Sequence, residues 1–272
     1  MLRQGLALLI SGWVVLGATS YGWAQQPGGA TAGPVPPATL RPVPPQPEAP
    51  SGPVIWVADV LGRLGTVNLG SGAVSVKGFM KNGSRTVVMT DIAFCPGGAL
   101  YGITFGSDRR LYRITTTTNP RATPIGSHGQ SGLNALVCDA AGQLFAHSFN
   151  TARLFKVNKS TGATTVVGST GSVRSAGDLA FHEGGLFLTN TTKGLTKLNA
   201  RSGAVLSTRL HNVRDMFGLV STATNRLYGV AGTKIYLFAE NAAGPTGAVS
   251  VARDFTGRGL GATFGAAFNG NF

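Results

Sequence analysis

The residues best suited to chemistry in this sequence are basic, and they recur at intervals of about forty residues. One falls in each of five similar connecting segments: Arg85, His128, Arg174, Arg214 and Arg258. Neighbouring connecting segments add a second set: Arg109, Arg110, His147, Arg153 and Lys193. Converging guanidinium groups suit carboxylate, sulfate or phosphate, because each can donate two parallel hydrogen bonds. The spacing therefore predicts a basic, anion-binding face.

Aspartates accompany these basic residues, and the sequence leaves three roles open for them. They can pair with the arginines as ties between neighbouring units, which contribute about 0–1 kcal/mol each at a surface. They can be catalytic in a glycosidase-like or lactonase-like hydrolase, for which the candidates are Asp91, Asp178 and Asp215. Glycoside cleavage needs one carboxyl with a raised pKa and one ionised partner. The third role is a calcium cage, in which Asn134 would join Asp91 and Asp178.

Two features of the sequence disfavour the enzyme. The proton donor of comparable glycosidases is usually Glu, whereas Glu183 and Glu240 belong to connections that we expect at the opposite end of the fold. A face rich in cations also opposes a bound divalent cation. We therefore predict a protein that is not an enzyme, and we keep the hydrolase as the alternative.

The two cysteines, Cys95 and Cys138, follow equivalent segments of neighbouring repeats, as Phe94-Cys95 and Val137-Cys138. Proximity would allow one disulfide in an oxidising compartment. His182 stands at the corresponding place in the next repeat, so a Cys-Cys-His metal site is an alternative. Since the later repeats offer Ser221 and Gly265 there, we expect a disulfide or two thiols, and we predict no metal site and no cofactor.

These residues must be positioned by a repeated β-unit. An aliphatic residue followed by an aromatic one occurs five times: Ile55-Trp56, Leu100-Tyr101, Leu144-Phe145, Leu186-Phe187 and Leu227-Tyr228. A second apolar segment follows each pair, and Gly-containing turns such as Thr161-Gly162 and Ser202-Gly203 precede the last segment of most units. Four short strands in a unit copied at this spacing are typical of a propeller blade.

The two ends of the repeat region complement each other. Pro47-Glu48-Ala49-Pro50, just before Ile55, cannot pair in the centre of a sheet. Residues 260–264, after the fifth unit, have the pattern of an innermost strand. Pairing this C-terminal segment with the first unit would complete a blade and close the ring. We therefore predict an all-β protein with a single propeller of five four-stranded blades, and six blades as the alternative count.

The phrase Asp91-Ile92-Ala93-Phe94-Cys95-Pro96-Gly97-Gly98-Ala99-Leu100-Tyr101-Gly102 resembles the repeats of exported bacterial β-propeller proteins of the broad YVTN and NHL kind. The resemblance covers residues 55–272 and implies architecture alone. These groups include lactonases, other hydrolases and binding modules, and no residue set here matches one functional family.

The N-terminal region is expected to lie outside the propeller. Residues 1–24 resemble a signal peptide, with Arg3, an apolar run over residues 6–18 and Gly22-Trp23-Ala24 at the cleavage site. The run is shorter than the about twenty residues that a membrane span needs, so we expect no transmembrane anchor. Residues 25–54 are rich in Pro and Gly and predict a disordered stalk, and residues 55–272 form the predicted propeller domain.

Composition narrows the class of partner. The net charge of +13, from 23 Lys and Arg against 10 Asp and Glu, favours polyanionic partners. No Lys/Arg-rich run is present, so nucleic acid is not an expected partner. We predict an exported, periplasmic or extracellular, monomeric binding protein for an anionic small molecule, an acidic glycan or an envelope protein.

Overall fold

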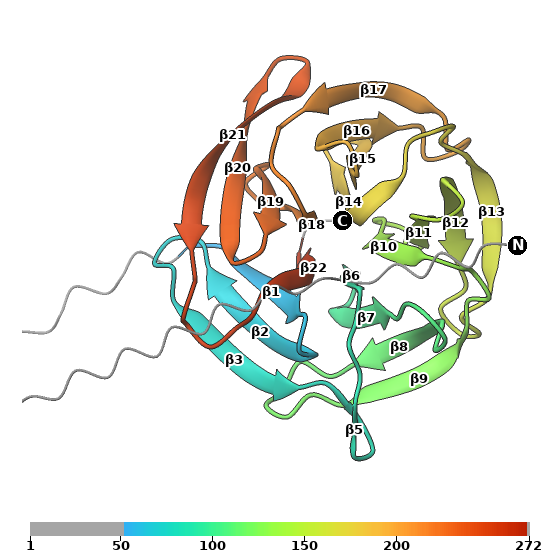
Figure 1. Cartoon of the computed structure of the whole chain (residues 1–272), viewed down its shortest axis with the longest axis vertical. Coiled ribbons are helices and arrows are strands. Elements are labelled where there is room, and N and C mark those ends of the chain that lie inside the picture. The colour runs from blue at the N-terminus through green and yellow to red at the C-terminus, as the bar shows by residue number, and fades with distance from the viewer. Residues whose placement is uncertain (1–51, 271–272) are drawn as a thin grey trace, which may run out of the picture. The chain divides into compact units, whose positions relative to one another are not determined.

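The computed structural model describes residues 52–270, and all regular structure in them is β-strand. Five four-stranded sheets are arranged as blades around a central axis (Figure 1). The predicted fold class, an all-β propeller of five blades, is confirmed. This part of the chain contains no helix that could cross a membrane. The expected signal peptide, and residues 25–51 of the expected stalk, lie outside the described residues.

Each blade runs from an inner strand at the axis to an outer strand at the perimeter. Blade 1 consists of β22 (Thr263–Phe268), β1 (Val54–Asp59), β2 (Arg63–Asn68) and β3 (Val74–Phe79). Blade 2 consists of β6 (Asp91–Cys95), β7 (Ala99–Ile103), β8 (Arg110–Ile114) and β9 (Ala122–Ser127). Blade 3 consists of β10 (Leu133–Cys138), β11 (Leu144–Ser148), β12 (Arg153–Val157) and β13 (Thr164–Ser169).

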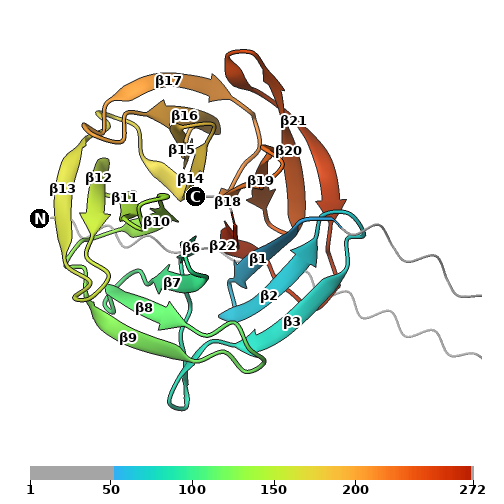
Figure 2. The same cartoon turned by 180° about the vertical axis from the view of Figure 1, so that it is seen from behind.

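The remaining blades follow the same order. Blade 4 consists of β14 (Ser175–His182), β15 (Gly185–Asn190), β16 (Gly194–Leu198) and β17 (Val205–Leu210). Blade 5 consists of β18 (Met216–Ser221), β19 (Leu227–Ala231), β20 (Lys234–Asn241) and β21 (Gly244–Asp254). A small hairpin of β4 (Lys81–Asn82) and β5 (Arg85–Thr86) lies in the connection between blades 1 and 2. Figure 2 shows the outer strands following one another around the perimeter.

The C-terminal strand closes the ring. β22 pairs antiparallel with β1, with Ile55 opposite Phe268 and Val57 opposite Ala266. The first and last described strands therefore share one sheet, as the leftover C-terminal pattern predicted. The expectation differed only in detail, because β22 begins at Thr263 and extends to Phe268.

The repeated aliphatic-aromatic pairs pack the blades together. The aliphatic members are all at most 1% exposed: Ile55, Leu100, Leu144, Leu186 and Leu227. Successive side chains of a strand point to opposite faces of the sheet, so each aromatic member meets the other neighbouring blade. The rings of Trp56 and Phe94 lie 5.7 Å apart edge to face, as do those of Phe145 and Phe181. The aromatic residues thus belong to the blade interfaces.

The outer strand of a blade ends against a turn of the next blade. Gly168, near the end of β13, lies so close to Ser202 that an added Cβ would be 1.8 Å from the Ser202 carbonyl oxygen. Gly126 near the end of β9 meets Thr161 in the same way, at 2.0 Å. These glycines are needed because no side chain fits between the two backbones.

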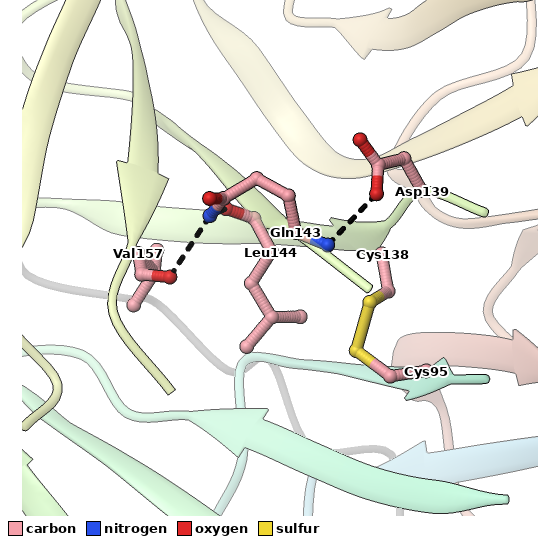
Figure 3. The surroundings of a disulfide bond; sticks show 6 residues. All are labelled: Cys95, Cys138, Asp139, Gln143, Leu144 and Val157. Atoms are coloured by element: carbon pink, nitrogen blue, oxygen red, sulfur yellow. Dashed lines mark hydrogen bonds between the residues drawn. A yellow bond between two sulfur atoms is a disulfide. The ribbon is translucent and has the colours of Figure 1, made fainter. Parts of the chain in front are cut away.

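A disulfide joins the inner strands of blades 2 and 3. Cys95 of β6 and Cys138 of β10 are bonded, with their Cα atoms 5.1 Å apart (Figure 3). Beside it, the backbone N–H of Gln143 donates to Asp139 at 2.7 Å, which closes the turn after β10. The bond therefore fixes two neighbouring blades at the end of the channel opposite the basic connections.

Candidate functional site

The five inner strands meet around the axis, and equivalent positions can be matched by their pairing. In each blade, the aliphatic residue of the repeated pair lies on the second strand and is paired with one residue of the inner strand. These inner-strand residues are equivalent to one another: Phe268, Phe94, Cys138, Phe181 and Ser221. Three places earlier stand Gly265, Asp91, Ala135, Asp178 and Gly218. The ring of blades therefore brings two aspartates, from blades 2 and 4, to the same level of the channel.

Each aspartate accepts backbone hydrogen bonds from its own strand and from the next blade. The Asp91 carboxyl accepts the N–H of Ile92 at 2.7 Å and that of Leu136 at 2.6 Å. The Asp178 carboxyl accepts the N–H of Leu179 and that of Leu219, both at 2.6 Å.

The backbone amide of Ala266, on the fifth inner strand, acts on the same carboxyl and lowers the pKa of Asp178. The two carboxyls thus accept hydrogen bonds from one inward-facing amide of each of four inner strands. Such amides have no strand partner on the channel side and would cost free energy if left unpaired.

The two carboxyls also interact with each other. Both side chains are 0% exposed, and burial raises the pKa of Asp91 and of Asp178 well above their usual range. The negative charge of Asp178 raises the pKa of Asp91 further. The pair therefore holds a proton at pH values where an exposed aspartate is ionised.

A raised pKa is what a proton donor needs, but these two carboxyls have no space for a substrate beside them. Gly265 packs directly on Asp91, so that an added Cβ would be 2.5 Å from Asp91 Oδ1. The structure therefore supports a structural role for Asp91 and Asp178, which is to accept the hydrogen bonds of the inner strands.

The mouth of the channel, on the side of the basic connections, is apolar. A cavity of about 190 Å³ lies there, and its lining has no arginine. The lining residues are Thr90, Phe105, Asn134, Ala176, Gly177, Phe217 and Phe264. Asn134 donates to the Ala176 carbonyl at 3.2 Å, and its Oδ1 has no hydrogen-bond partner among residues 52–270. The surface at the axis is thus mainly apolar and carries no arginine.

The two histidines expected on this face are buried and neutral. His128 Nε2 lies 3.1 Å from the Thr104 carbonyl oxygen, and its Nδ1 accepts the N–H of Gln130. Burial lowers the pKa of His128. His147 Nε2 lies 2.9 Å from Thr170 Oγ1, and burial lowers the pKa of His147 to about 3. Neither side chain carries positive charge at neutral pH.

Two of the arginines on this face lie beside one carboxylate. Arg85 Nη2 and Arg110 Nε each lie 3.4 Å from an oxygen of Asp108. The Arg85 side chain is 63% exposed, so solvent screens this pair. Asp108 also accepts the hydroxyl of Tyr112 at 2.7 Å. Burial, followed by this contact, raises the pKa of Tyr112 to about 12.

Other arginines donate to backbone carbonyls instead of carboxylates. Arg174 Nη1 donates to the carbonyls of Phe149 and Asn150, at 2.8 and 2.6 Å. Arg109 donates to Gly106 at 2.9 Å, and Arg258 donates to Gly72 of blade 1 at 3.0 Å. Arg153 is exposed at the start of β12. These cations are spread over the face and do not line a common cavity in the described chain.

Arg214 differs from the others because it lines a cavity and has no ion-pair or hydrogen-bond partner for its side chain within residues 52–270. This cavity, of about 550 Å³, lies between blades 5 and 1. Its lining residues are Val60, Asn212, Val213, Arg214, Asp215, Phe217, Ala231, Gly232, Tyr236, Ala262 and Thr263. Asn212 and Asp215 have positive φ values of 58° and 52°, which turn the connection sharply before β18. We refer to it below as the blade 5/1 cavity.

Sequence reasoning identified Arg214 and Asp215 but missed the other lining residues. Phe217 lies one place before the aspartate level of the channel, and it lines both the mouth and the blade 5/1 cavity. Thr263 Oγ1 is buried without a hydrogen-bond partner in the described chain. Phe217 carried no distinguishing signal, because the equivalent places in the other units hold Thr90, Asn134, Gly177 and Phe264. Tyr236 and Thr263 had none either.

Comparisons with known proteins assign this chain to no family. No protein-family model matches the chain, and no curated protein matches it. Similar solved structures include a Bacteroides caccae protein of unknown function, with 12% identity, 71% of this chain and 70% of that one covered, and a TM-score of 0.46. Virginiamycin B lyase from Staphylococcus aureus has 12% identity, coverage of 76% and 71%, and a TM-score of 0.45.

A third solved structure is the PQQ-bound aldose sugar dehydrogenase from Streptomyces coelicolor. It has 18% identity to this chain, coverage of 55% and 58%, and a TM-score of 0.41. At these identities the neighbours assign no activity to this protein.

Proposed function

We propose that this protein is an exported, non-catalytic β-propeller that binds an acidic glycan, or a similar anionic ligand, in the blade 5/1 cavity. The observation that carries the proposal is Arg214 on the wall of a cavity of about 550 Å³, with no partner for its guanidinium in the described chain. Pockets for small ligands are typically of this size and combine apolar walls with few polar groups.

The chemistry of the cavity wall fits a sugar acid. A guanidinium can bind a carboxylate or sulfate through two parallel hydrogen bonds. Phe217 and Tyr236 provide aromatic surface for the apolar face of a sugar ring. The Asn212 amide and the Asp215 carboxylate provide donors and acceptors for ring hydroxyls.

The remaining charge of the protein supports the same class of ligand. The net charge of +13 attracts polyanions over a distance. The other arginines of this face, such as Arg153 and Arg174, extend the positive surface beyond the cavity. The apolar N-terminal segment and the Cys95–Cys138 disulfide support export to an oxidising compartment.

The proposal is tested by calorimetric titration of the full chain with a short heparin oligosaccharide, and with dextran as the uncharged control. Arg214→Gln should weaken heparin binding by about 10- to 100-fold, because a hydrogen bond to a charged group contributes about 1.5–3 kcal/mol. The affinity should also fall with added salt, and dextran should bind far more weakly.

The matched control is Arg226→Gln, which makes the same charge change on the same blade, in the exposed turn before β19 at the opposite end. It should change the affinity less than twofold. Equal losses in the two variants would show that net charge alone attracts the ligand, and the proposal would then be wrong.

A further inference from the structure

A cluster of three metal-ligating side chains lies at the end of the propeller opposite the basic connections. His182 ends β14 of blade 4, and Glu183 follows it in the turn to β15. Glu240 comes from β20 of blade 5. One ligand atom from each of the three residues can be chosen so that all lie within 4.8 Å of one another.

His182 has one nitrogen with a partner and one without. The residue is 2% exposed, and its Nδ1 lies 2.9 Å from Ser221 Oγ. Its Nε2 has no hydrogen-bond partner in the described chain. An Nδ1–H donated to Ser221 leaves Nε2 with a free lone pair, and a hydrogen bond of this kind holds metal-binding histidines in place.

The approach of Glu240 to this nitrogen has the geometry of two ligands of one ion. Glu240 Oε1 lies 3.3 Å from His182 Nε2, yet the two atoms are not hydrogen-bonded. Two ligands of a tetrahedral ion at about 2.0–2.1 Å stand about 3.3–3.4 Å apart and point at the ion, not at each other. The same Oε1 accepts the N–H of Leu227 at 3.2 Å, which orients the carboxylate.

A hydrolytic Ser-His-Glu triad is the other chemistry that this cluster suggests, and the surroundings of Ser221 disfavour it. Ser221 is 5% exposed, and the cavity that it lines has a volume of about 40 Å³. A space of this size holds water but not an ester or a peptide. On the other side, a cavity of about 380 Å³ has His182, Glu183, Asp139 and Asn225 among its lining residues.

We propose that His182 Nε2, the Glu183 carboxylate and the Glu240 carboxylate bind one first-row divalent cation of the Zn²⁺ type. One imidazole and two carboxylates are ligands that such ions accept. The cavity beside His182 and Glu183 leaves the fourth position open to water or to a small anion. The sequence predicted no metal site, because Glu240 joins the cluster only through the packing of blade 5 on blade 4.

The cluster lies at the interface of blades 4 and 5, at the position where the Cys95–Cys138 disulfide joins blades 2 and 3. By strand register, His182 corresponds to Cys95, and Ser221 corresponds to Cys138. The disulfide ties blade 2 to blade 3, and the cation would tie blade 4 to blade 5 at the equivalent joint. Ligand binding at the basic face is independent of this site.

The proposal is tested with Zn²⁺ alone, by calorimetric titration of the full chain, and with Co²⁺, by visible absorption. Wild-type protein should bind one ion, and the thermal midpoint should rise with Zn²⁺ concentration. Glu183→Asn should weaken binding by about tenfold or more. Glu183 has a φ of 46°, which Asn tolerates better than Glu, so this variant should fold without difficulty.

A second variant and one control complete the test. Glu240→Gln keeps an acceptor for the Leu227 amide and removes the charge, and should also weaken Zn²⁺ binding by about tenfold or more. His211→Gln is the control, because His211 is a buried histidine with an unpartnered Nε2 outside the cluster. Binding that survives both Glu variants, or that is lost with His211→Gln, overturns the proposal, as does a failure of wild-type protein to bind Zn²⁺.

Discussion

Substitution of Asp91 tests whether the carboxyls of Asp91 and Asp178 stabilise the fold by accepting backbone amides of the inner strands. Asp91→Asn keeps a donor toward Asp178 but replaces one of the two oxygens that accept the amides of Ile92 and Leu136. One buried amide then loses its acceptor, which should cost about 1–3 kcal/mol of unfolding free energy. Asp91→Ala leaves both amides unpaired and should cost about 2–6 kcal/mol.

The pH dependence of this cost has a definite sign. Because the pKa of Asp91 is raised in the folded protein, the native state keeps a proton that the unfolded chain releases above about pH 4. The stabilisation from that proton is complete below about pH 4 and is lost as the pH rises to the folded pKa. Asn does not titrate, so Asp91→Asn should cost most near pH 4.5 and progressively less toward pH 8, by at most about 1.4 kcal/mol per pH unit.

The assay is denaturant unfolding of wild type, Asp91→Asn and Asp91→Ala at several pH values between 4.5 and 8. The difference between wild type and variant removes the contribution of the buried histidines, which titrate equally in both proteins. A cost that grows with pH would mean that Asp91 is an ordinary stabilised carboxylate and would refute the reasoning. A cost below about 0.5 kcal/mol for Asp91→Ala at every pH would refute it as well.

Three further predictions follow from single contacts. Reduction of the Cys95–Cys138 bond, which closes a loop with a sequence separation of 43, should lower the unfolding free energy by about 4 kcal/mol, as measured by urea unfolding with and without a thiol reductant. Gly168→Ala should lower the thermal midpoint, since the added Cβ collides with the Ser202 carbonyl and overpacking costs about 1–3 kcal/mol; an unchanged midpoint would contradict the close approach. His147 should show no titration between pH 5 and 8 in ¹⁵N NMR spectra of the imidazole, because its pKa is about 3, and a midpoint near 6.5 would show that it is exposed.

The fold could be predicted from the sequence because the information is repeated. Each blade repeats the same short strands. A strand whose pattern is weak in one unit can therefore be recognised from the equivalent segments of the others. The segment after Leu260 had no partner in its own unit, and this mismatch predicted the closure that β22 makes with β1. The number of blades followed from the five copies of the aliphatic-aromatic pair.

The candidate site was predictable only in part, because its geometry depends on packing between blades. Asp91 and Asp178 come from blades that are not neighbours, and only the narrow channel brings them together. His128 is buried, with its Nε2 3.1 Å from the Thr104 carbonyl oxygen, and no spacing in the sequence indicates this contact. Glu240 meets His182 for the same kind of reason, across a blade interface.

The basic connections were recognisable as a set, but the sequence did not distinguish Arg214 from the others. What separates it is the local shape of the cavity beside it. Phe217 and Tyr236 are among the residues that line this cavity.

The central claim, that an anionic ligand binds in the blade 5/1 cavity, is tested most directly by mapping amide chemical shifts of the ¹⁵N-labelled protein during titration with a short heparin oligosaccharide. We predict the largest changes over residues 212–217 and at Thr263, which line this cavity. Changes centred on the opposite end, near Arg226, or spread evenly over all exposed cations, would contradict the claim.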